Sequence, residues 1–63
     1  MEITKEMIKA VIMIQIRKHE DETGRRYRWN EALYYVSGYY PDAKITDALD
    51  VIDTLKAEKF LYY

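Results

Sequence analysis

Apolar residues dominate one stretch of the chain, residues 7–16, which only Lys9 and Gln15 interrupt. Placed on a helix, the apolar side chains of this stretch and its neighbours form two opposite faces. One face carries Ile3, Met7, Ala10, Val11 and Ile14, and the other carries Ile8, Ile12 and Ile16, with Met13 between them. Thr4 is a suitable N-cap, and the basic residues 17–19 suit a helix C-terminus. The pattern predicts a helix over about residues 4–19 whose middle is apolar on every side.

A helix that is apolar on every side is buried, crosses a membrane or binds a second partner. This helix is too short to cross a membrane, because a span needs about 20 apolar residues. We expect the Ile14 face to pack in the core. The opposite face, formed by Ile8, Ile12 and Ile16, is expected to mediate self-association into a homodimer. On this hypothesis Ile12→Glu breaks the assembly and Ile14→Glu unfolds the domain.

The middle of the chain changes pattern after Gly24. Residues 26–29 alternate charged and aromatic side chains, which predicts a short strand. Asn30 is a good helix N-cap and Gly38 a good residue to follow a helix end. A second helix is therefore expected over about residues 31–38. Its inner face holds Ala32, Leu33 and Val36.

A third helix is predicted over about residues 42–59, capped by Asp42 or Thr46. Its apolar face consists of Ile45, Ala48, Leu49, Ile52, Leu55 and Phe60, with Val51 at the edge. Its opposite face carries Asp47, Asp50, Asp53, Thr54 and Glu58. Residues 60–63 are expected to form a last strand, which pairs with the strand at residues 26–29.

The chain has 63 residues and is expected to form one small domain, residues 1–63. It has no cysteine, so neither a disulfide nor a cysteine-based zinc site stabilises its small core, and a cytoplasmic location is expected. The net charge is −1, but residues 1–29 hold seven Lys and Arg against five Asp and Glu, and residues 30–63 hold three against six. This balance is not that of a protein that binds nucleic acid by charge alone.

The expected order of helix, strand, helix, helix and strand resembles a winged-helix or helix-turn-helix domain over residues 30–62. The positions that carry the resemblance are Ala32, Leu33, Val36, Ile45, Ala48, Leu49, Ile52, Leu55, Phe60 and Leu61. It implies a mainly α, three-helix domain with a possible short two-stranded β patch and, because the chain stops at Tyr63, no full wing. It also implies that the third helix binds DNA, but the acidic residues on that helix repel phosphates and indicate contacts with protein.

No catalytic, metal or cofactor site is expected. His19 and Ser37 are the only histidine and serine, so a hydrolytic triad lacks its parts. Residues 19–22 lack the ligand spacing of a calcium loop. A solvated run of charges is the simpler interpretation of that segment.

Two sets of residues are candidates for binding. Tyrosine is frequent in interfaces, and the candidates for contact with a protein partner are Tyr34, Tyr35, Tyr63, Asp47, Asp50 and Asp53. The candidates for contact with nucleic acid are Lys18, Arg25, Arg26 and Arg28, unless these side chains only face water and the neighbouring acids. We therefore predict a small non-enzymatic protein–protein interaction module that self-associates through its first helix. The alternative is a winged-helix-type, DNA-binding transcriptional regulator.

Overall fold

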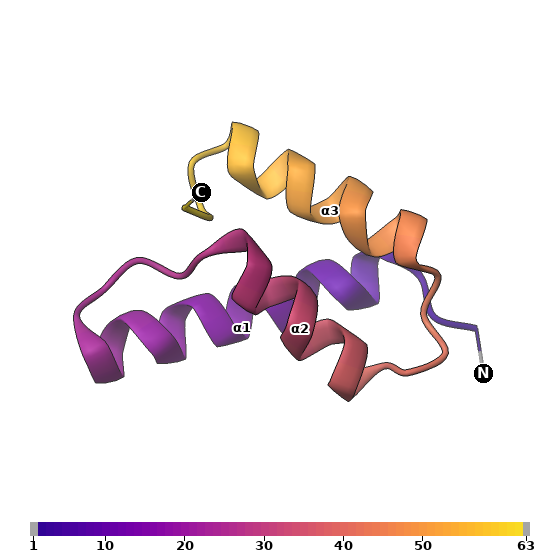
Figure 1. Ribbon diagram of the computed structural model, residues 1–63, viewed down its shortest axis with the longest axis horizontal. Helices are drawn as coiled ribbons and strands as arrows, with labels where there is room; N and C mark the ends of the chain where they lie inside the picture. Colours follow the sequence, from indigo (N-terminus) through magenta and orange to yellow (C-terminus); the bar gives the residue numbers. More distant parts are fainter. Residues whose placement is uncertain (1, 63) are drawn as a thin grey trace.

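Three α-helices form the protein, and the computed structural model describes residues 2–62 (Figure 1). They are α1 (Lys5–Thr23), α2 (Trp29–Tyr39) and α3 (Ile45–Ala57). In Figure 1, α2 crosses in front of α1 and α3 lies above both, and each helix packs against the other two. The prediction of a mainly α, three-helix domain is confirmed.

Helix α1 begins where its cap was predicted and runs further than predicted. The Thr4 hydroxyl accepts a hydrogen bond from the Met7 N–H at 3.3 Å, which satisfies one free donor of the first turn. The helix ends only at Gly24, whose backbone is left-handed (φ 69°) and whose N–H donates to the Glu20 carbonyl oxygen at 2.8 Å. The basic residues before Glu20 did not mark the end, because a left-handed glycine is the stronger stop signal.

The core contains the face of α1 that was predicted to be free. Ile8, Ile12 and Ile16 are buried, and they meet residues of α2 and α3. The buried residues of the other two helices are Ala32, Val36, Ala48, Val51, Ile52 and Leu55. The assignment of Ile8, Ile12 and Ile16 to a self-association surface is therefore wrong. These three side chains already lie against their own chain, because both partner helices dock on this side of α1.

Helix α2 begins one residue before the predicted cap. Arg28 is the N-cap, with extended backbone, while Asn30 lies inside the first turn and its Oδ1 accepts a hydrogen bond from the Glu31 N–H at 3.0 Å. Gly38 lies inside the helix, which ends at Tyr39. The Trp29 N–H donates to the Tyr62 carbonyl oxygen at 2.8 Å. This long-range bond holds the start of the helix, so no Asn30 cap is needed.

Helix α3 is shorter than predicted at both ends. Residues 41–43 form a turn, and the helix begins at Ile45 after Lys44. At its other end Lys59 has a left-handed backbone (φ 66°), which stops the helix, and the Phe60 N–H donates to the Leu55 carbonyl oxygen at 2.9 Å. Ile45 and Leu49 belonged to the predicted inner face, but both are exposed.

The two predicted strands are a single β-bridge within the described residues. Arg28 and Tyr62 form a parallel bridge, in which the Tyr62 N–H donates to the Tyr27 carbonyl oxygen at 2.8 Å. The predicted pairing of these two segments is therefore correct, although neither forms a strand, because α2 starts at Trp29. The bridge places Tyr27 and Leu61 in the core. Tyr63 lies outside the described residues.

Candidate interaction surfaces

The outward face of α1 is apolar although it faces solvent. Ile14 is 69% exposed and Ala10 is exposed, whereas Met7, Val11 and Met13 are half-buried. Met7, Ala10 and Ile14 lie opposite the Ile8–Ile12–Ile16 ridge on the helix, and Val11 and Met13 lie on the flanks. The sequence identified two apolar faces on this helix, and the structure exchanges their roles. We call Met7, Ala10 and Ile14 the α1 seam.

A hollow adjoins the α1 seam where the C-terminal turn passes over α1. Its walls are formed by Met13, Ile14, Ile16, Arg17, Glu20, Asp21 and Phe60. The Phe60 side chain is 42% exposed. The hollow adds apolar side chains of Met13, Ile16 and Phe60 beside the seam, with the charged residues Arg17, Glu20 and Asp21 on its walls.

Tyrosines cover the outer side of α2. Tyr34 is 84% exposed, Tyr35 stacks on Tyr39 with ring centroids 5.8 Å apart, and Tyr39 meets the edge of Tyr40 at 4.8 Å. Tyr35 is half-buried. Tyr34 is thus largely exposed, whereas part of the Tyr35 ring is covered by neighbouring residues of the same chain.

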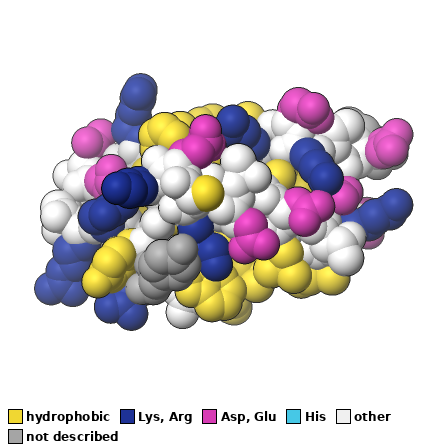
Figure 2. Space-filling model, turned by 90° about the horizontal axis from the view of Figure 1, so that it is seen from above, with side chains coloured by type: hydrophobic (Ala, Val, Ile, Leu, Met, Phe, Trp, Pro, Cys, Tyr) yellow, Lys and Arg dark blue, Asp and Glu magenta, His cyan; other side chains and the backbone are white. Residues whose placement is uncertain are grey.

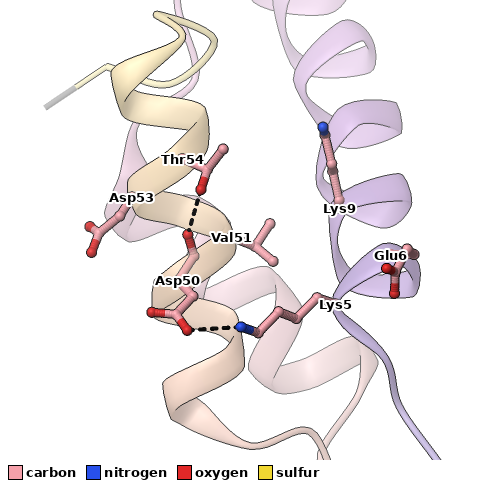
Figure 3. Close-up of a pocket in the computed structure, with 7 residues that line it drawn as sticks. All are labelled: Lys5, Glu6, Lys9, Asp50, Val51, Asp53 and Thr54. Carbon is pink, nitrogen blue, oxygen red and sulfur yellow. Dashed lines mark hydrogen bonds and ion pairs between the residues drawn. The ribbon is translucent and has the colours of Figure 1, made fainter.

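The acidic residues of α3 are partly engaged by lysines. Lys5 of α1 reaches Asp50 at 3.0 Å (Figure 3), and Lys56 lies 3.4 Å from Asp53. The hydrogen bond and charge of Asp50 raise the pKa of Lys5 above its usual value. Asp47 is half-buried. Such exposed pairs add little stability, but they reduce the acidic character that the sequence alone indicated for this face.

Lysine and arginine side chains gather at one end of the molecule. Figure 2 shows this crowding at the left, which in Figure 1 is the end where α1 turns into α2. Arg25, Arg26 and Arg28 line one groove of about 790 Å³ there, together with His19, Thr23, Asn30, Glu31 and Tyr62. Lys18, the fourth predicted contact, is an exposed residue of α1 that does not line this groove.

The aromatic residue of the groove is one that the sequence did not indicate. Tyr27, which alternates with the arginines in the sequence, is buried, and its ring lies 4.8 Å from that of His19. Burial and the nearby Glu31 charge raise the pKa of Tyr27 above its usual value. Trp29 is half-buried, with the Lys56 ammonium 5.1 Å from its ring. Tyr62 is the exposed aromatic residue that lines the groove, and it lies there because the chain reverses after α3 and pairs with Arg28.

Two further features are absent from residues 2–62, namely a cluster of metal ligands and a membrane-spanning helix. No group of three or more His, Asp or Glu side chains is placed to hold a metal ion there. None of the described helices combines the length and apolar character needed to cross a membrane. The class of protein that the structure defines is a small three-helix bundle with a β-bridge. Comparison with protein-family models, curated proteins and solved structures finds no match, so the winged-helix resemblance remains a prediction from spacing.

Proposed function

We propose that this protein is a small, non-enzymatic interaction module whose first contact is with a second copy of itself, through the α1 seam. The observation that carries the proposal is Ile14, an isoleucine in the middle of the longest helix that is 69% exposed. Contiguous exposed apolar surface of this kind marks sites of association.

The spacing of the seam residues indicates that a helix of the second copy packs against them. Met7, Ala10 and Ile14 are separated by three and four residues, and Ile3 continues the series before the cap. This 3–4 spacing is the contact line of paired helices. In an antiparallel pair centred between Met7 and Ala10, each Met7 faces Ala10 of the other copy. The same surface then serves both copies, as a twofold interface requires.

The charges beside the seam and the surface area available there are compatible with an antiparallel pair of α1 helices. The positions that flank the seam are Thr4, Glu6, Val11 and Met13. Only Glu6 among them is charged, and it faces Met13 of the second copy, so no like charges oppose each other. A small specific dimer buries about 600 Å² from each partner, which is about an eighth of the 4659 Å² surface. The outward side of one helix in a three-helix bundle, with the adjoining hollow, is of that order.

The test compares the sedimentation equilibrium of the wild type with that of Ile14→Glu. We expect a dimer at micromolar concentration for the wild type. The dimer Kd of Ile14→Glu should be about a hundredfold higher or more, because the pair loses two buried isoleucines at about 1.5–3 kcal/mol each. Ala10→Glu should act in the same direction.

Ile45→Glu is the matched control. Ile45 is also an exposed isoleucine, 56% accessible, at the start of α3, and it is not part of the seam. This variant should remain dimeric, and circular dichroism should show that all three variants keep their helices. A wild type that is monomeric at high micromolar concentration, or an Ile14→Glu variant that still dimerises, contradicts the proposal.

A further inference from the structure

The groove at the junction of α1 and α2 is lined by three arginines and only one acidic residue. Arg25, Arg26 and Arg28 are all exposed, and none forms an ion pair with a described acidic residue. The one acid in the groove, Glu31, lies 3.9 Å from His19. No ion pair joins Glu20, Asp21 or Glu22 to these arginines, although Glu20 lines the neighbouring hollow together with Arg25 and Arg26.

The side chains of the three arginines make different contacts. The Arg26 guanidinium donates a hydrogen bond to the Lys59 carbonyl oxygen, so it holds the C-terminal turn against the loop after α1. The Arg28 side chain lies over the Tyr62 ring, 5.9 Å from its centroid. The Arg25 side chain forms no ion pair with another described residue. Arg25 and Arg28 are thus the side chains available to an anion.

Tyr62 adds an aromatic surface to the groove. Its side chain is 48% exposed, and its backbone is fixed by the two hydrogen bonds of the β-bridge. The ring stands beside Arg26 and Arg28, with guanidinium carbons 5.7 and 5.9 Å from the centroid. An exposed, positioned ring next to arginines that form no ion pair combines the two elements that bind unpaired nucleotides, charge for phosphate and an aromatic face for the base.

We propose that this groove binds a single strand of nucleic acid, with Arg25 and Arg28 on phosphates and Tyr62 stacked on a base. An unpaired strand fits better than a duplex, because a base must leave its stack to reach the Tyr62 ring. The groove lies at the opposite end of α1 from the centre of the proposed dimer, so the site does not depend on self-association.

The experiment measures the fluorescence anisotropy of a labelled 12-nucleotide single strand of mixed sequence, titrated with the full chain at low and moderate salt. Arg25→Ala combined with Arg28→Ala should weaken binding about tenfold or more. The slope of log K against log salt should fall by about 1.4, since each single-strand phosphate contact contributes about 0.7. Tyr62→Ala should weaken binding about tenfold at unchanged slope, because stacking is not ionic, and Tyr62→Phe should bind like the wild type.

Lys9→Ala combined with Lys44→Ala is the control, because it removes the same charge from exposed positions outside the groove. This control should keep its affinity within about twofold. Equal losses in both double variants, or no binding to the strand at low salt, overturn the proposal. So does a duplex that binds as tightly as the strand while Tyr62→Ala has no effect, or binding only to vesicles of phosphatidylserine.

Discussion

Ile12 is completely buried among the three helices, whereas Ile14, two residues later, is exposed. Ile12→Ala leaves a cavity in the core and should lower the free energy of unfolding by about 2–5 kcal/mol. Ile14→Ala leaves no cavity and should lower it by less than about 1 kcal/mol. Urea denaturation at low protein concentration, where the monomer dominates, measures both. Similar losses for the two variants would show that the α1 seam is also part of the core.

The ionisation of Tyr27 should make the free energy of unfolding depend on pH in the alkaline range. Its folded pKa is raised above the ordinary value of 10.0, chiefly by burial. Below about pH 10 both states keep the proton; above it the unfolded chain loses the proton first, so the free energy of unfolding falls as pH rises. In Tyr27→Phe this contribution is removed, so the fall between about pH 9 and 11 should be shallower. Urea midpoints across that window provide the measurement.

The Lys5–Asp50 pair acts in the same pH range and needs its own control. The raised pKa of Lys5 means that its contribution is complete below the unfolded value of 10.5 and is lost as pH rises through the folded pKa. The pair is exposed, so its effect is small. Lys5→Met should therefore change the alkaline profile less than Tyr27→Phe. The opposite order would show that burial of Tyr27 is not the main cause.

Two glycines mark the difference between the end and the interior of a helix. Gly24 has a φ of +69° at the end of α1, so Gly24→Ala should lower the free energy of unfolding by about 1 kcal/mol even though nothing lies near the added methyl group. Gly38 sits inside α2 with open space around it, and Gly38→Ala should raise that free energy by about 0.5–1 kcal/mol. Thermal and urea unfolding of the two single variants provide a matched pair. Equal signs for both would contradict this assignment.

The helix boundaries show which local signals are strong. The Thr4 cap is local, since its hydroxyl bonds to a backbone N–H three residues later, and it could be predicted. The start of α2 is not local, because the Trp29 N–H is held by the Tyr62 carbonyl oxygen. Asn30, although a good capping residue, is therefore the second residue of the helix and not its N-cap. The local capping preference of a residue does not decide where a helix begins when a distant backbone group accepts the hydrogen bond of the first turn.

The molecule as a whole is closed by its C-terminal segment. Leu61 is buried in the core, and the bridge beside it ties the end of the chain to the loop before α2. The same closure carries Phe60 to the α1 hollow and Tyr62 to the arginine groove. The arginine groove and the hollow beside the α1 seam therefore each include a residue from this segment, and each is lined by residues far apart in sequence.

Charge is also arranged over the whole molecule. The sequence showed an excess of Lys and Arg in its first part and of Asp and Glu in its second. In space the arginines after α1 meet at one end (Figure 2), while Lys5 crosses to Asp50 and mixes the charges at the other end. A net charge near zero therefore conceals a basic end, and potentials depend on the placement of charges as well as on their sum.

Periodicity and local preference were enough to establish three helices, the Thr4 cap, most of the core positions on α2 and α3, and two opposite apolar faces on the first helix. They were not enough to choose which of these faces lies inside. The angular spacing of side chains on a helix is a local property, but the direction of the core depends on where other helices dock. For the same reason the sequence named Arg25, Arg26 and Arg28 and missed Tyr62, which reaches them only because the chain turns back after α3 and pairs with the segment before α2.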